Sequence, residues 1–274
     1  MSIITPNDGQ ELQSSAPAWL PPFQPVGLTS DLVEELSLPA KGFALKARKA
    51  MKTTDLLEHD QLLGALPPEQ RLALAYARGE DKAVFLGLMA LDARLAGIVR
   101  ASREPLLAQL RLAWWREQLA APAGQRPAGE PLLALLDHWG EERAALAALV
   151  DGWEALLGEA PLAQELLVEF AQGRAAACAA LARRLAPATD PQEAGRAGRN
   201  WALVDLAARV SHPDERIAGL HLAQGLDWSR PKLGRELRPL LILHGLARGG
   251  RGGEGMMSGP ASLILAVRLG LFGI

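Results

Sequence analysis

The chain has 274 residues, of which 49% are hydrophobic, a length that allows one large buried core or two small ones. Its formal net charge of −2 gives no global attraction to nucleic acid, so we expect no nucleic-acid partner. Aromatic residues make up only 5% of the chain and runs of β-branched residues are few, which favours helices. The one cysteine, Cys178, excludes an intramolecular disulfide, is typical of a reducing compartment, and lies among alanines, where we expect a small core residue.

The sequence predicts neither a secretory signal nor a membrane-spanning helix. The first residues, MSIITPNDGQ, lack the basic start and apolar stretch of a secretory signal. No stretch reaches the roughly 20 apolar residues of a membrane-spanning helix, and Arg268 interrupts the apolar run over 261–274. We therefore expect a cytoplasmic protein or one peripheral to the inner membrane.

Residues 1–60 form the first predicted unit, an N-terminal arm. Prolines punctuate its first two-thirds, and a basic segment that favours a helix follows over 41–52. The arm is predicted to bind a protein partner or an anionic membrane surface and so to localise the protein; a loosely docked tail and a short solvated helix are the alternatives. Its candidate docking residues are Trp19, Phe23, Lys41, Lys46, Arg48, Lys49 and Lys52.

The second unit, 61–274, is predicted to be all-α. Apolar residues recur at spacings of three and four over 81–100, which indicates one buried helix face. Ser102 and Pro105 indicate the start of another helix that runs to about 120. Further helices are expected from about Pro67 and over 131–139, 141–157, 161–185, 193–210 and 231–248, with a glycine-rich loop over 249–253.

The helix that follows Pro105 carries Arg111, Trp114, Trp115 and Arg116. This segment, after its acidic-Pro turn, resembles the squalene/phytoene synthase family, and most closely the branch that includes respiratory complex I assembly factors. The resemblance implies an isoprenoid-synthase-like helical bundle, here with an N-terminal extension, and a cleft between the 81–100 and 193–210 helices. A tryptophan at a seam between helices is more often core packing than a binding group.

The family holds magnesium with two acidic clusters, and the resemblance implies that both are lost. The family's pattern places Ala96, Gly97 and Arg100 at the first cluster, and Arg209 with a position near Pro213 at the second. An arginine cannot bind a cation as a ligand. The residual acids, Asp92 and Asp205, could face each other across the cavity, although an isolated helical acid more often lies at the surface or in a salt bridge.

Two functions remain open. In the first, the protein has lost magnesium-dependent condensation and acts by binding, as an assembly or scaffold factor, with the arm bound to a respiratory or other membrane complex, or as a binder of an isoprenoid or lipid. In the second, it is a prenyltransferase that holds diphosphate with arginines, and the candidates are Arg100, Arg103, Arg111 and Arg209. Ion pairing with nearby acids explains these arginines equally well.

No cofactor is expected under the first function, and magnesium only under the second. The five histidines show no metal-ligand spacing, so no metal ligand is assigned: His59, His138, His212, His221 and His244.

Overall fold

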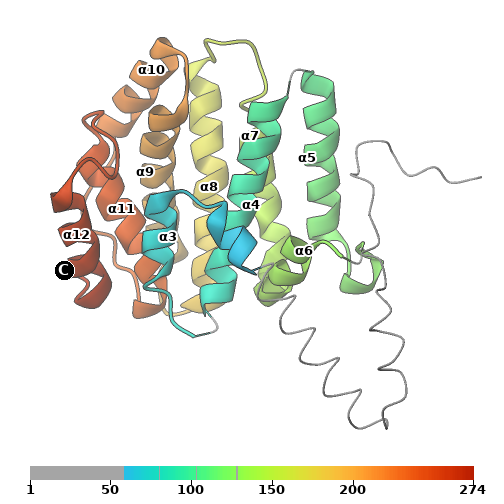
Figure 1. Ribbon diagram of the computed structural model, residues 1–274, viewed down its shortest axis with the longest axis horizontal. Coiled ribbons are helices and arrows are strands. Elements are labelled where there is room, and N and C mark those ends of the chain that lie inside the picture. The colour runs from blue at the N-terminus through green and yellow to red at the C-terminus, as the bar shows by residue number, and fades with distance from the viewer. Residues whose placement is uncertain (1–58, 80, 103, 128) are drawn as a thin grey trace, which may run out of the picture. The chain divides into compact units, whose positions relative to one another are not determined.

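A computed structural model describes residues 59–79, 81–102, 104–127 and 129–274. The candidate docking residues of the arm and Arg103 lie outside the described residues. Within the described residues the chain is all-α, without a strand, as predicted (Figure 1). Residues 59–64 are helical, and ten α-helices follow: α3 (Pro68–Leu74), α4 (Asp81–Ala101), α5 (Pro105–Ala120), α6 (Pro131–Leu136), α7 (Ala147–Glu154), α8 (Gln164–Leu185), α9 (Pro191–Arg209), α10 (Pro213–Gln224), α11 (Arg238–Gly250) and α12 (Pro260–Leu271). Three 3-10 helices join them: η2 (Ala123–Gln125), η3 (Asp137–Leu146) and η4 (Arg235–Leu237).

Proline in the first turn begins most of these helices, because its fixed φ suits that position and its missing N–H has no partner there anyway. Side chains cap some of the same ends. The Asp190 carboxylate accepts a hydrogen bond from the Gln192 backbone N–H at 2.9 Å, and Glu130 caps α6 in the same way. Local sequence thus sets where α6 and α9 start.

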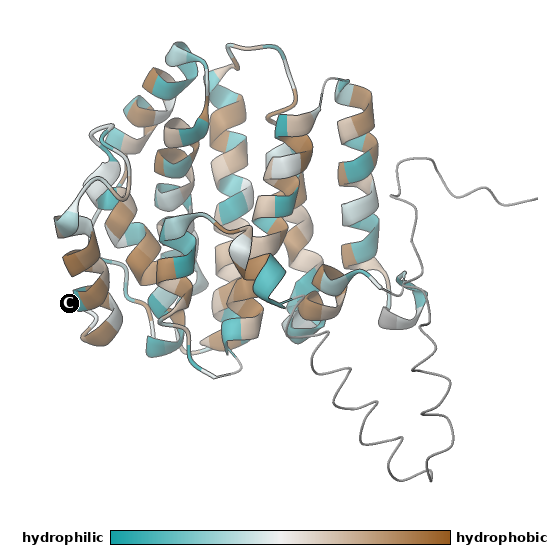
Figure 2. Cartoon of the chain, viewed as in Figure 1, coloured by the Kyte–Doolittle hydropathy of each residue, from teal (hydrophilic) through white to brown (hydrophobic). Residues whose placement is uncertain are grey.

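The centre of the fold is the pair α8 and α9, with α7 packed on α8 and both α10 and α11 packed on α9. Small residues allow the close approach of α8 and α9, because a Cβ at Gly198 would lie 2.6 Å from the Cys178 Sγ. Cys178 is fully buried, and burial raises the pKa of its thiol to about 12. The prediction of a small core residue is confirmed. Figure 2 shows apolar residues alternating with polar ones along most helices, as amphipathic packing requires.

Four details differ from the predicted elements. The two helices expected over 131–157 are broken by η3, where Gly140 has a φ of 55°. The helix expected from Pro231 begins at Arg238, after η4. α10 and α12 were not predicted, although Pro213 and Pro260 occupy their first turns, a position that proline favours. No helix in the described ranges is long and apolar enough to cross a bilayer.

His244 on α11 is a buried polar side chain. Its Nε2 lies 3.4 Å from the Asn200 Nδ2, and burial lowers the pKa of His244 from 6.5 to about 4. The unfolded chain therefore binds more protons than the folded chain between these two values, so the stabilisation is complete above pH 6.5 and is lost as the pH falls toward 4.

We predict that the His244→Gln variant loses less stability than the parent protein between pH 7 and pH 5. The difference should be about 2 kcal/mol, since each pKa unit corresponds to about 1.4 kcal/mol. Urea unfolding at the two pH values measures it, with His221→Gln as the control at an exposed position. Equal losses in the parent and in His244→Gln would contradict the assignment.

Candidate functional site

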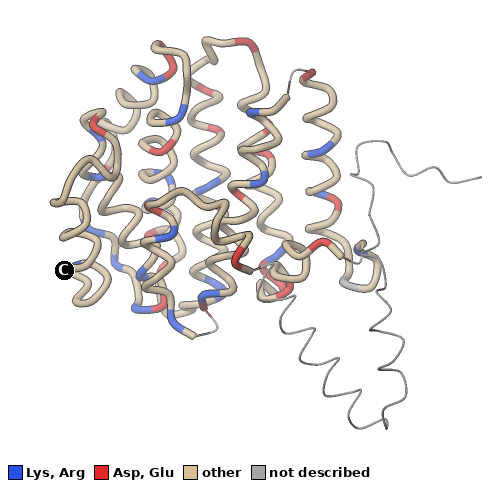
Figure 3. Tube along the Cα trace, viewed as in Figure 1, with Lys and Arg blue, Asp and Glu red and all other residues tan. Residues whose placement is uncertain are grey.

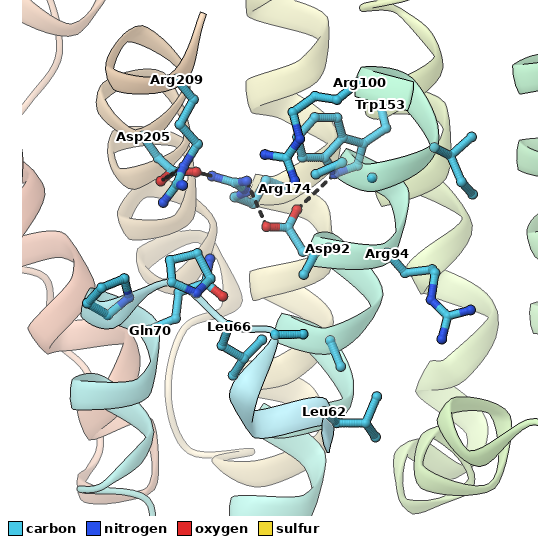
Figure 4. Close-up of a pocket in the computed structure, with 18 of the residues that line it drawn as sticks. Leu62, Leu66, Gln70, Asp92, Arg94, Arg100, Trp153, Arg174, Asp205 and Arg209 are labelled. Carbon is cyan, nitrogen blue, oxygen red and sulfur yellow. Dashed lines mark hydrogen bonds and ion pairs between the residues drawn. The ribbon is translucent and has the colours of Figure 1, made fainter. Parts of the chain in front are cut away.

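A cleft of about 660 Å³ opens between α4 and α9 (Figure 4). The turn before α3 covers one side, and α5, α7 and α8 each contribute one side chain. Its apolar wall is formed by Leu62, Ala65, Leu66, Ala90, Ala93, Ala96 and Ile98. Four residues that the predicted resemblance aligns with the family's acidic positions all line the cleft: Ala96, Gly97, Arg100 and Arg209.

Arg174 of α8 lies between two acids on the floor of this cleft. Its Nη2 donates to the Asp92 Oδ2 at 2.8 Å, and its Nη1 donates to the Asp205 Oδ2 at 3.0 Å. All three side chains are almost completely buried, with exposed side-chain fractions of 1% for Arg174 and 4% for each acid. Asp92 and Asp205 thus face each other across the cleft through one guanidinium, as the dashed lines in Figure 4 show.

The remaining oxygens of the two acids also accept hydrogen bonds. The Trp153 Nε1 donates to the Asp92 Oδ1 at 2.8 Å, and the Arg209 Nε donates to the Asp205 Oδ1 at 2.7 Å. Arg209 also pairs with Glu69 of α3. Because every carboxylate oxygen of Asp92 and Asp205 already accepts from a donor, neither acid has an oxygen left without a hydrogen-bond partner to offer a cation.

The electrostatics keep Arg174 charged. Burial alone would lower its pKa, but Asp92 and Asp205 outweigh that effect and raise the pKa of Arg174 above its ordinary value. Burial raises the pKa of Asp92, against the opposing attraction of Arg174. The guanidinium also lies over the Trp201 ring, 4.2 Å from its centroid, which further favours a cation there.

This arrangement differs from a metal centre in its chemistry. An arginine offers only donors, so it satisfies the two acids without providing any ligand for a metal ion. In the part of the chain that the structure describes, no three His, Cys, Asp or Glu residues gather closely enough to hold a metal ion.

The rim of the cleft carries two arginines without a carboxylate partner among the described side chains. Arg100 of α4 and Arg111 of α5 both line the cleft and are exposed to solvent. Arg94, by contrast, pairs with Glu130 and points away from the floor in Figure 4. Three of the four predicted anion-binding arginines therefore line one cleft, but Arg209 is held by acids, and only Arg100 and Arg111 remain for a ligand.

The tryptophan-rich signature of α5 divides into one cleft residue and three packing residues. Trp115 is buried and forms an edge-to-face pair with Trp114 at 5.1 Å between centroids. The Arg116 Nε donates to Asp151 of α7 at 2.8 Å, and Arg116 also pairs with Glu154. Trp114, Trp115 and Arg116 thus join α5 to its neighbours, while Arg111 alone reaches the cleft.

Four residues of the site were not predicted: Arg174, Trp153, Glu69 and Gln70. Gln70 is buried in the cleft wall, and its Oε1 accepts no hydrogen bond from any described group. None of the four left a local signal in the sequence, and Arg174 stands before the alanine-rich run 175–180 as other arginines of the same helix also lie near alanines. A charged side chain must find partners if it is buried.

No protein-family model matches the chain, and no curated protein or solved structure matches it either. The family resemblance of the α5 segment therefore remains a prediction. The function is argued from the geometry of the cleft.

Proposed function

We propose that the protein is an isoprenoid-synthase-like binding protein that has lost magnesium-dependent condensation. The observation that carries this proposal is Arg174, whose guanidinium occupies the space between Asp92 and Asp205. In a condensing enzyme, facing acids bind the metal ions that neutralise the leaving diphosphate. Here the facing acids are neutralised by the protein itself, so the cleft is suited to hold a ligand and not to ionise one.

The ligand that fits the cleft is an amphiphile with an anionic head. Arg100 and Arg111 supply two guanidinium groups at the rim that pair with no carboxylate of the described residues, and arginine binds phosphate or carboxylate bidentately. The apolar wall suits an isoprenoid or lipid chain, and the unpaired amide oxygen of Gln70 can accept a hydrogen bond within it. Such a ligand leaves the ion pairs of Arg174 with Asp92 and Asp205 intact.

A prenyltransferase that uses arginines instead of metal is the second candidate. It is favoured by one observation, that Arg100, Arg111 and Arg209 line the same cleft, as this mechanism requires. The pairing of Arg209 with Asp205 and Glu69 counts against it, because those acids already neutralise the guanidinium. Two free arginines must then meet the whole charge of a leaving diphosphate.

An assembly or scaffold role is compatible with the same cleft. This role requires a protein partner, and we assign the binding of that partner to the arm. The candidate partners are a respiratory complex or another membrane complex. A bound amphiphile would then order the cleft without being changed. Affinity purification with and without residues 1–60 tests the partner separately from the ligand.

We expect farnesyl diphosphate to bind the full chain without magnesium, and the Arg100→Gln/Arg111→Gln variant to bind about tenfold to a hundredfold more weakly. Each lost arginine should cost about 0.7 to 1.4 kcal/mol at these exposed positions, and every 1.4 kcal/mol is a factor of ten. Isothermal titration calorimetry in a magnesium-free buffer measures the affinity.

The matched control for this prediction is Arg184→Gln/Arg199→Gln, which removes the same two charges from exposed positions of α8 and α9 outside the cleft. Its affinity should equal that of the parent protein. An equal loss in both double variants would assign the effect to net charge, and no loss in either would remove the rim arginines from the site.

A further inference from the structure

The outer face of α12 carries a continuous group of exposed apolar side chains. Leu263, Ile264, Val267 and Leu271 fall within an arc of about 100° at 3.6 residues per turn, and Phe272 and Ile274 continue the group beyond the helix. Ile264, Leu271 and Phe272 are each more than 60% exposed. An exposed apolar face of this kind typically marks an interaction site.

The opposite face of α12 is fully used in packing. Ala266 and Leu269 are buried, and α12 packs on α11 and α3. A Cβ at Gly245 of α11 would lie 2.3 Å from the Leu269 Cδ1, so the two helices are in close contact. α12 therefore presents its outer face from a fixed position, and that face has no cover among the described elements.

Arginines border this apolar face. Arg238 donates to the Leu269 carbonyl oxygen at 3.3 Å, Arg268 donates to the Ile274 carbonyl oxygen at 2.9 Å, and Arg230 donates to the Gly273 carbonyl oxygen. Burial lowers the pKa of Arg238, and the positive charges of Arg235, Arg230 and Arg78 lower it further. No Asp or Glu side chain of the described residues pairs with any of these five arginines, so no acidic side chain compensates their charge.

The charge of the chain is correspondingly uneven. Residues 228–274 contain seven lysines and arginines but only two acids, a net charge of +5, on a chain whose total is −2. Figure 3 shows basic positions gathered around α11 and α12, near the end marked C. A helix with an apolar face and a basic border is suited to lie in the headgroup region of an anionic bilayer.

We propose that the outer face of α12, with its border of Arg78, Arg230, Arg235, Arg238 and Arg268, docks on an anionic lipid bilayer. The apolar side chains would enter the boundary between headgroups and acyl chains, and the guanidinium groups would contact lipid phosphates. A second copy of the chain is a poorer occupant, because a symmetric contact through α12 would bring two uncompensated arginine clusters together. This docking surface is separate from the cleft and does not depend on its ligand.

Co-sedimentation of the full chain with vesicles tests the proposal. Vesicles of equimolar phosphatidylcholine and phosphatidylglycerol should bind the protein. Vesicles of phosphatidylcholine alone should bind it more weakly, by a factor of about ten or more. The Ile264→Gln/Leu271→Gln/Phe272→Gln variant should lose about tenfold or more in affinity for the anionic vesicles, because three inserted apolar side chains are replaced. Arg78→Gln/Arg235→Gln should show a smaller loss that disappears at high salt.

The control for the apolar face is Leu106→Gln/Leu107→Gln/Leu110→Gln, which changes three exposed leucines of α5 and should bind as the parent protein does. The control for charge is Arg184→Gln/Arg199→Gln. Circular dichroism of every variant separates loss of docking from loss of fold. Unchanged vesicle binding by the folded α12 variant would overturn the proposal and assign any binding to the arm. If the α12 variant changes its oligomeric state and not its vesicle binding, the proposal is also overturned, and the face is a contact between copies of the chain.

Discussion

Replacing Arg174 with methionine is expected to lower the free energy of unfolding by about 4 kcal/mol. The substitution keeps an apolar side chain of similar length between α4 and α9 but removes the guanidinium that bridges Asp92 and Asp205. Both acids then lie buried without a compensating cation on the floor of the cleft. Urea unfolding followed by circular dichroism at pH 7 measures the change.

A compensated variant distinguishes charge from packing. In the Asp92→Asn/Arg174→Met/Asp205→Asn variant the amide oxygens can still accept from Trp153 and Arg209, and no buried charge lacks its partner. We expect this variant to recover most of the lost stability. If Arg174→Met alone unfolds like the parent protein, or if the triple variant is as unstable as the single one, the ion network does not hold the floor of the cleft.

Replacing Gly173 with alanine is expected to lower the free energy of unfolding by roughly 3 kcal/mol, at the upper end of the usual range for overpacked cores. A Cβ at this position would lie 2.4 Å from the Ala148 carbonyl oxygen and 2.9 Å from the Gly152 Cα, so the crossing of α7 and α8 would have to open. Both obstacles are backbone atoms, which cannot move aside as a side chain can. Thermal and urea unfolding measure the effect.

Gly97→Ala is the matched control, because Gly97 also lies inside a helix but has no atom within 4 Å of an added Cβ. Alanine is the better helix former by about 1 kcal/mol, so this variant should be as stable as the parent protein or more so. A similar loss at both glycines would mean that the α7 and α8 crossing is not the cause.

The sequence predicted most of the helical body because apolar spacing and first-turn prolines are local signals. The 81–100 segment forms α4 with its predicted apolar face buried. Asp92 and Asp205 face each other, as one alternative held, and both also lie in salt bridges, as the other alternative held. α12 was missed because its apolar residues cover both the packed and the exposed face, so no clear period separates it from an apolar tail.

The floor of the cleft was not predictable in the same way. Arg174 is 82 residues from Asp92 and 31 from Asp205, and only the packing of α8 against α4 and α9 brings the three together. Nothing local distinguishes Arg174 from arginines such as Arg183 and Arg184 on the same helix, which are exposed. Arg174 pairs with the two acids because it is buried between them, and which position of a helix is buried depends on the tertiary fold.

Release of pyrophosphate from farnesyl or geranylgeranyl diphosphate by the full chain is the most direct test of a cleft that binds without condensing. With Arg174 between Asp92 and Asp205, we predict that release stays at the level of the buffer with and without magnesium, under conditions where calorimetry shows the diphosphate bound. Pyrophosphate release that requires magnesium and rises with protein concentration would contradict this account of the cleft.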